Sequence, residues 1–238
     1  MFGGEVAWLP DNSGFLYTPQ NSSDPKDLKG TLDTRARLHR LGTAAKADPE
    51  LFSRAKYPKL GLRPDQYPYL FYSDDNTQLY GLAFSVDNRV TAWVTSPAEL
   101  LKPSIAWKRV AAPADSVYGL YGFLKLGTRM YLHSVKGARH GKILVTDAAN
   151  PNPATAAVLL PEGPLNITGI VSTKDFLFVK LNDGINDQIR QYDPRTKQWA
   201  PVPLPLTGSV SITPLDAPRS NDVHIGLTSW KQPLTIYD

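Results

Sequence analysis

The chain has 238 residues, 42% of them apolar and 20% charged, and a formal net charge of +4 at pH 7. It contains no cysteine, which excludes disulfides, zinc–thiolate sites and cysteine nucleophiles. Because the basic residues are mixed with acidic ones and no apolar run approaches the ~20 residues that cross a bilayer, we expect neither a nucleic-acid partner nor a membrane segment.

The first half of the chain predicts two groups of short strands separated by turns. The whole chain contains 21 prolines and 17 glycines, and their scattered distribution indicates many turns and few long helices. The first group runs from Val6 to about Lys56, and a polar turn over 10–14 joins its first two strands. The predicted strands cover residues 6–8, 15–17, 36–41 and 51–52 in the first group, and 69–72, 79–84, 90–93 and 105–110 in the second.

The second half of the chain predicts three more groups of the same kind. Hairpin turns are expected at Lys136–Gly137 and at Asn182–Gly184. The fifth group stops after its third strand. The predicted strands cover residues 117–123, 130–135 and 143–145, then 167–171, 176–181, 189–192 and the region of Trp199, and finally 210–215, 223–227 and 234–237.

Helical signals are short. Asp48–Phe52 predicts one helical turn, with Asp48 as its N-cap and Pro49 at its first position. Ser96–Lys102 predicts another. Neither segment is long enough to compete with an all-β interpretation.

Five groups of about 45 residues, each of about four strands, are typical of propeller blades. A blade cannot bury its faces alone, so neighbouring blades stack around a common axis. We therefore expect an all-β fold, a β-propeller of about five four-stranded blade units. These units would form a single domain over residues 1–238.

No residue pattern in the chain points to catalysis, a cofactor or a metal ion. A serine nucleophile usually lies on a G-x-S-x-G elbow, and the segment Gly208–Ile212 lacks the second glycine. Three of the four histidines, His39, His133 and His224, fall within predicted strands beside apolar neighbours. His140 falls at a loop tip. We predict no catalytic, cofactor-binding or metal-ligating residue, and no cofactor.

Two carboxylate pairs and one aromatic cluster have both functional and structural interpretations. Asp74–Asp75 and the pair of Asp183 with Asp187 could perform acid–base chemistry or bind a hard cation. Hairpin turns, in which aspartate bonds its own backbone, are the favoured interpretation. The aromatic residues could form a stacking platform, but we expect them to fill the space between blades. They are Tyr67, Tyr69, Phe71 and Tyr72.

Two propeller families resemble parts of the chain. Tyr192–Trp199 resembles the end of a kelch blade, but the kelch Gly-Gly pair occurs only at residues 3–4, and the match covers one group of five. Ala7–Tyr17 resembles the blade opening of prolyl oligopeptidases, and Leu38–Thr43 their Tyr-x-His-x-Leu-Gly-Thr strand and turn, with leucine replacing the aromatic residue. Thr228–Tyr237 is similar to their Thr-Ser-aromatic-x-x-Pro-x-x-Ile-Tyr. These motifs follow the order of the prolyl oligopeptidase family.

The resemblance implies that the chain is about five of the seven blades of a propeller that lids a serine peptidase. The catalytic Ser, Asp and His would then lie in an α/β-hydrolase domain outside this chain. In the family, the propeller admits short peptides to the catalytic cleft and excludes folded proteins. The peptidase then cleaves these peptides after proline. The expected partners are the hydrolase domain and short peptides. An incomplete ring would also expose blade faces and edges, so we expect self-association or closure into a tighter ring.

A polar stretch over residues 20–34 matches a mobile loop of that family involved in substrate entry. Because it has almost no apolar residue to bury, it should be mobile and protease-sensitive. A plain surface insertion is the alternative. The turn over 73–77 has no basic residue, although family members often direct an arginine from this connection toward the substrate. The candidate gating residues are Gln20, Asn21, Asp24, Lys26, Asp27, Lys29 and Asp33.

Two other functions remain open at this point. The chain could be a free-standing five-bladed or kelch-like propeller that binds a ligand or a protein. Coding sequence beyond Asp238 without a G-x-S-x-G elbow would favour it. It could also be an independent hydrolase, which turnover of a proline-containing chromogenic peptide would indicate. No signal peptide is visible in residues 1–4, and we expect a soluble protein whose compartment, cytoplasmic or periplasmic, stays open.

Overall fold

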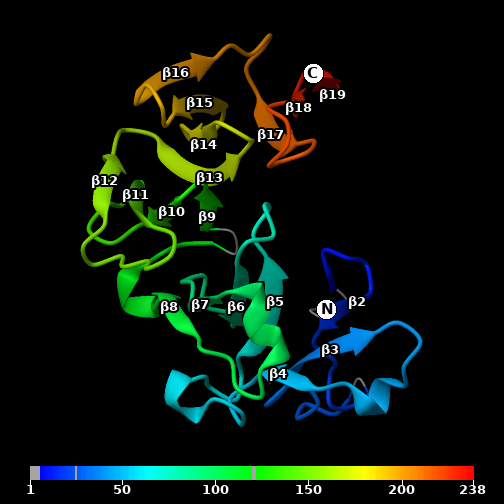
Figure 1. The fold of residues 1–238 in the computed structure, drawn as a ribbon. Helices are drawn as coiled ribbons and strands as arrows, with labels where there is room; N and C mark the ends of the chain where they lie inside the picture. Colours follow the sequence, from blue (N-terminus) through cyan, green and yellow to red (C-terminus); the bar gives the residue numbers. More distant parts are fainter. Residues whose placement is uncertain (1–5, 25, 120–121) are drawn as a thin grey trace. The chain divides into compact units, whose positions relative to one another are not determined.

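The computed structural model describes residues 6–24, 26–119 and 122–238, and within them the chain forms 19 strands in five antiparallel sheets (Figure 1). Strands that neighbour each other in a sheet also follow each other in the sequence, so every sheet is a meander of hairpins. This arrangement confirms the predicted all-β class and the five strand groups. The chain divides into two units, Met1–Ala112 with two sheets and Pro113–Asp238 with three.

The first unit contains two four-stranded sheets. The first sheet has the order β1 (Ala7–Trp8), β2 (Gly14–Tyr17), β3 (Ala36–Arg40) and β4 (Glu50–Phe52). The second has the order β5 (Tyr67–Tyr72), β6 (Leu79–Phe84), β7 (Ala92–Thr95) and β8 (Lys108–Ala111). All eight lie within a few residues of the predicted strands.

One apolar core joins the two sheets of the first unit. Leu16, Leu38 and Phe52 from the first sheet pack in the same cluster as Leu70 and Trp93 from the second. Successive side chains of a strand point to opposite faces of the sheet, and these side chains lie on the face toward the neighbouring sheet. The first two blade units are therefore packed face to face.

The turn that opens the chain has the chemistry predicted for it. The Leu9 amide donates to the Gly14 carbonyl oxygen at 3.0 Å, and Asn12 adopts a φ of 56°. A Cβ atom on Gly14 would lie 2.1 Å from the carbonyl oxygen of His39 on the paired strand β3. Only glycine therefore lets β2 approach β3 at this position.

The described residues contain four short 3-10 helices, and one of the two predicted helical turns is wrong. In η3 (Pro97–Leu101), the Ser96 hydroxyl caps the first turn by accepting from the Ala98 amide at 3.4 Å, as expected. Within the predicted turn over 48–52, however, Glu50–Phe52 forms strand β4, because pairing with β3 places Phe52 in the core. The other three helices are η1 (Ala45–Ala47), η2 (Pro58–Leu60) and η4 (Pro113–Asp115). None of the helices in the described residues is long and apolar enough to cross a membrane.

The second unit contains three sheets. The four-stranded ones are β9 (Phe123–Leu126), β10 (Arg129–Ser134), β11 (Lys142–Asp147) and β12 (Ala157–Leu160), and β13 (Asn166–Ser172), β14 (Leu177–Asn182), β15 (Asp187–Asp193) and β16 (Gln198–Val202). The last sheet has only β17 (Ser209–Pro214), β18 (Val223–Ser229) and β19 (Gln232–Tyr237). The prediction that the fifth group has three strands is confirmed.

The third strand group differs most from its prediction. Its first strand lies at Phe123–Leu126 rather than at 117–123, where residues 120–121 lie outside the described residues. A turn ends the predicted run, because Gly119 has a φ of 88° and accepts a hydrogen bond from the Gly122 amide. Strand β12 has no counterpart among the predictions. It is an outer strand, and its Val158 is 55% exposed, so the sequence there lacks a clear apolar alternation.

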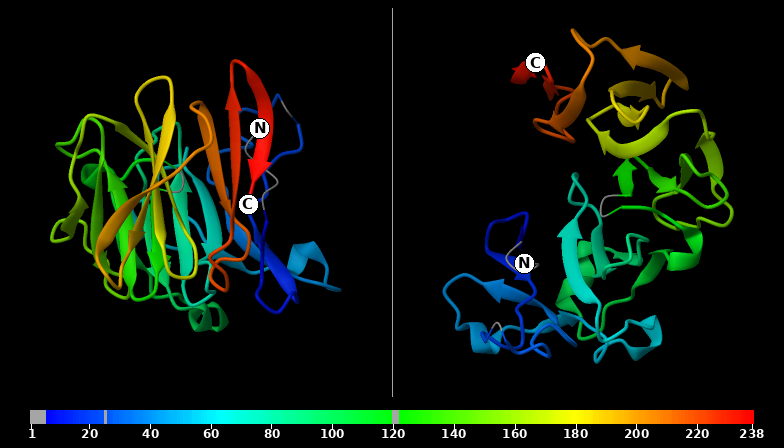
Figure 2. Two further views of the ribbon diagram at one scale, coloured as in Figure 1. Left: turned by 90° about the horizontal axis from the view of Figure 1, so that it is seen from above. Right: turned by 180° about the vertical axis from the view of Figure 1, so that it is seen from behind.

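Strand β14 is apolar on both faces because both faces are covered. Leu177 and Val179 pack in a cluster with Tyr131 of the β9–β12 sheet, whereas Phe178 packs with Val210 of the last sheet. In both views of Figure 2 the last sheet lies beside the β13–β16 sheet. The alternating sides of one central strand thus hold three sheets together.

Candidate functional site

The polar segment 20–34 joins β2 to β3 and is closed on itself. The Asn21 amide donates to the Gly30 carbonyl oxygen at 2.8 Å, and the Asn21 side chain donates to the Leu32 carbonyl at 2.6 Å. Asp24 and Asp27 accept from backbone amides two residues ahead, at 2.9 and 3.0 Å. The segment is therefore a chain of tight turns rather than an extended strap. Pro25 lies outside the described residues.

The candidate gating residues are mostly directed to water. Gln20, Asn21, Asp24, Lys26, Asp27 and Lys29 are exposed, and Asp33 is half-buried. At the tip, the apolar side chain of Leu28 is 87% exposed. The segment thus presents both charge and one unburied leucine to its surroundings.

Asp33 attaches the C-terminal end of the segment to the rest of the first unit. Its carboxylate accepts two hydrogen bonds from the Arg54 guanidinium, at 2.6 and 3.1 Å, and its amide donates to the Pro64 carbonyl at 2.8 Å. The hydrogen bonds from Arg54 lower the pKa of the Asp33 carboxyl. At the other end, the Thr18 hydroxyl donates to the Pro68 carbonyl at 2.6 Å in a buried position. The N-terminal end is therefore fixed by a buried side-chain hydrogen bond, and the C-terminal end by one backbone hydrogen bond and an exposed ion pair.

A second cluster lies on the first sheet and was not predicted. The Tyr17 hydroxyl donates to the Asp48 carboxylate at 2.7 Å, and His39 Nδ1 lies 3.0 Å from the same group. Asp48 is 5% exposed and is the C-cap of η1, not the predicted N-cap. Residues 17, 39 and 48 are far apart in the sequence, so no local pattern signalled their contact.

The other histidines do not form a hydrolytic constellation in the described residues. His133 is buried in β10, its Nε2 atom has no hydrogen-bond partner, and burial lowers its pKa to about 4. His140 Nδ1 lies 2.9 Å from the Gly163 carbonyl oxygen, and His224 Nε2 lies 2.9 Å from an oxygen of Asp238. Within residues 6–24, 26–119 and 122–238, no hydrogen bond joins a histidine to a serine hydroxyl.

Most turn carboxylates bond their own turns, as predicted, but Asp187 does not. Asp183 accepts from the amides of residues 185 and 186 at 2.8 and 2.7 Å. Asp187 is 8% exposed and accepts instead from the Asn182 side chain and from the Val210 amide, both at 2.8 Å. Lys180 Nζ lies 3.6 Å from the carboxylate. This buried group therefore clamps the β13–β16 sheet to the last sheet.

Of the four aromatic residues of β5, Tyr72 packs against the core between the two sheets of the first unit, as expected of a blade-filling side chain. The Tyr67 hydroxyl donates to the Thr18 carbonyl. The rings of Tyr69 and Phe71 are stacked with centroids 5.7 Å apart. Their contacts account for them without a ligand.

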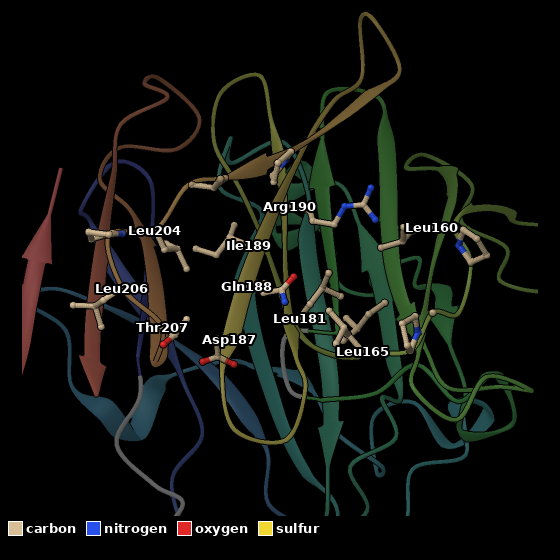
Figure 3. Close-up of a pocket in the computed structure, with 17 residues that line it drawn as sticks. Leu160, Leu165, Leu181, Asp187, Gln188, Ile189, Arg190, Leu204, Leu206 and Thr207 are labelled. Carbon is tan, nitrogen blue, oxygen red and sulfur yellow. The ribbon is translucent and has the colours of Figure 1, made fainter. Parts of the chain in front are cut away.

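The second unit carries a groove of about 870 Å³ around the start of β15 (Figure 3). Its walls come from β12, β13, β14, β15, β16 and the segments that precede β13 and β17. Four prolines line it, at positions 161, 164, 201 and 205. Arg190 and Asp187 are its charged residues. Sequence reasoning missed this groove, because its residues come from separate strands.

Comparison with known proteins relates this fold to one domain family. The family model described as "Prolyl oligopeptidase, N-terminal beta-propeller domain" matches residues 1–238. Two curated relatives, each named "Prolyl endopeptidase", come from Elizabethkingia miricola and Elizabethkingia meningoseptica. Each is 25% identical over 98% of this chain, and the chain spans 31% of the relative's length. The chain therefore corresponds to about a third of these proteins.

Solved structures agree on the fold. A structure from a study of two prolyl endopeptidases superposes with a TM-score of 0.78 at 20% identity, over 98% of this chain and 32% of its own. Prolyl oligopeptidase B from Galerina marginata, bound to a 35mer substrate, gives 0.79 at 18% identity over 99% and 32%. Oligopeptidase B from Trypanosoma brucei gives 0.74 at 14% identity over 98% and 32%. The chain belongs to the family of prolyl oligopeptidase N-terminal β-propeller domains.

Proposed function

We propose that this propeller domain is the lid of a prolyl-oligopeptidase-like serine peptidase and that segment 20–34 gates the entry of short proline-containing peptides. Family membership over the whole chain supports the lid role. The relatives' names supply the activity, and their greater length leaves room for a catalytic α/β-hydrolase domain, which would be the partner of this domain. The chain itself would contribute no bond-breaking group.

The observation that carries the gating role is the unequal attachment of the segment. Thr18 is fixed by a buried hydrogen bond, whereas Asp33 is held by one backbone hydrogen bond to Pro64 and by an ion pair whose two side chains are 45% and 49% exposed. Exposed ion pairs contribute little stability, so losing this pair costs little and leaves Asp33 held by its hydrogen bond to Pro64. The unburied Leu28 gives the tip an apolar group to place against a peptide or the catalytic domain.

The test uses the complete open reading frame that contains these residues, which should encode a G-x-S-x-G elbow. Because Asn21 and Gly30 are hydrogen-bonded at 2.8 Å, residues 22–29 can be excised and the ends rejoined by two glycines. We expect the kcat/KM for a long unfolded substrate to rise relative to that for a short proline peptide. The matched control is Val86→Ser, which replaces a fully exposed apolar residue outside the segment and should leave the ratio of the two kcat/KM values unchanged.

Two outcomes would contradict the proposal. The first is an unchanged ratio of the two kcat/KM values in the excised enzyme, which would leave the segment a plain surface insertion. The second is turnover of a proline-containing chromogenic peptide by the 238-residue chain alone. That result would place catalytic groups within the propeller.

We further propose that the isolated chain associates with itself through the outer faces of its first and last sheets. On the first sheet Trp8 is 51% exposed and lies 5.5 Å from the ring of Phe15. On the last sheet Leu234 and Ile236 are 64% and 54% exposed. Exposed apolar faces of this kind favour association. Sedimentation should show concentration-dependent oligomers, and a monomer at every concentration would contradict this.

A further inference from the structure

The groove of the second unit has an apolar floor and one cationic side chain, Arg190, for which the described residues provide no ion pair. In Figure 3 the Arg190 side chain leaves β15 and extends toward Leu160, above Leu165 and Leu181. Ile189, Leu204 and Leu206 lie on the other side of β15. The volume of about 870 Å³ covers the space on both sides of β15 and exceeds what a single solvent molecule fills.

Arg190 is the group that gives this groove its chemical preference. Its guanidinium carbon lies 5.3 Å from the ring centroid of Trp199, so the aromatic face supports the side chain while its N–H donors stay free. Among the described residues, no carboxylate lies within ion-pair distance of Arg190. A half-buried guanidinium without an acidic partner is a ready site for a ligand carboxylate.

Asp187, the acidic residue that lines the groove, does not neutralise this site. Its two oxygens accept from Asn182 and Val210, and Lys180 lies 3.6 Å from it. The carboxylate is thus committed to the clamp between two sheets. The groove presents net positive character beside apolar walls.

We propose that this groove binds the free C-terminus of a short peptide whose last residue is apolar. The terminal carboxylate would receive two hydrogen bonds from the Arg190 guanidinium, and the apolar side chain would contact Leu160, Leu165 and Leu181. Charge complementarity selects the carboxylate, and the prolines of the rim, which lack an N–H, leave the apolar floor without competing donors. The site lies within one unit and does not depend on the peptidase role proposed above.

The test measures binding to the 238-residue chain by isothermal titration calorimetry. The probe is an N-acetylated tripeptide ending in leucine, offered as the free acid and as the C-terminal amide. We expect the acid to bind at least about tenfold more tightly than the amide, the effect of one charge-assisted bidentate contact. Equal binding of the two forms, or no binding of either, would overturn the proposal.

Variants distinguish binding at Arg190 from a general effect of removing one positive charge. Arg190→Gln should reduce the acid-to-amide ratio to about one, and Arg190→Lys should restore only part of it because lysine lacks the planar fork. The matched control is Arg195→Gln, whose side chain is 64% exposed, pairs with Asp193 and does not line the groove. It should leave the ratio unchanged, and an equal loss in Arg195→Gln would overturn the proposal.

Two further experiments test whether the groove itself is the binding site and whether it requires a peptide. Leu165→Glu places a carboxylate in the groove without changing Arg190, and acid binding should be lost while the thermal midpoint confirms that the variant folds. Octanoate supplies the same charge and an apolar chain without a peptide. If octanoate binds as tightly as the tripeptide acid, the groove recognises apolar carboxylates in general and the assignment to peptide C-termini is wrong.

Discussion

In the first unit the rings of Phe52, Trp93 and Trp107 meet in the core between two four-stranded sheets, whereas in the second unit mixed aliphatic and aromatic clusters and a buried carboxylate hold three sheets together. Phe52 lies 5.5 Å from Trp93 and 5.0 Å from Trp107, measured between ring centroids. In the second unit Asp187 bonds the first residues of the last sheet directly. The last sheet has one strand fewer, and a directional polar contact fixes its register where less apolar surface is available.

The largest expected effect tests the aromatic core. Phe52→Ala removes a fully buried ring and should lower the free energy of unfolding of the first unit by about 3–5 kcal/mol. Urea denaturation followed by tryptophan fluorescence measures the change. Trp230→Ala, at a fully exposed position, is the control and should change little. A small loss in Phe52→Ala would mean that the rings are not the main contact between these sheets.

The next effect tests the polar clamp. Asp187→Ala leaves the Val210 amide and the Asn182 side chain without their acceptor, which should cost about 3 kcal/mol. Hydrogen exchange should accelerate in β17–β19 and stay unchanged in β5–β8. Asp183→Ala is the control, because Asp183 bonds only its own exposed turn. Equal exchange changes in both units would contradict a local clamp.

A buried histidine makes the second unit sensitive to acid. Burial lowers the pKa of His133 to about 4, so below pH 6.5 the unfolded chain takes up a proton that the folded chain does not. Stability should therefore fall as the pH drops from about 6.5 to 4, by up to about 3 kcal/mol. Thermal midpoints of the native chain and His133→Gln over this range measure the effect. His224→Gln, half-exposed, is the control, and identical slopes in all three would contradict it.

The smallest effect on stability concerns the segment 20–34. Asp33→Asn removes the charge that pairs with Arg54, and because both side chains are exposed the thermal midpoint should hardly change. Limited proteolysis within 22–31 should nevertheless become faster, since residue 33 then keeps its backbone hydrogen bond to Pro64 but not its ion pair. Arg63→Gln removes a comparable exposed pair with Asp65 elsewhere in the unit and should leave the cleavage rate unchanged.

The strand pattern and its turns followed from local chemistry. Alternating apolar residues and the turn at Asn182–Gly184 predicted β14 and β15 to within two residues, because φ/ψ preferences and burial on alternate faces act over a few neighbours. The family motifs at both ends of the chain pointed to the correct fold and domain family. The prediction of a strand over 117–123 was wrong because Gly119, at a φ of 88°, leaves the extended conformation of a strand, which periodicity alone does not reveal.

The functional contacts were decided by the tertiary structure. Asp48 meets Tyr17 across 31 positions, Asp187 meets Val210 across 23, and the groove around Arg190 is assembled from five strands and the segments between sheets. Such contacts depend on which strands pair and which faces pack, and this is set by long-range burial. The sequence therefore determined which segments are strands, whereas the packing of sheets decided which polar groups are buried, paired or left free for a ligand.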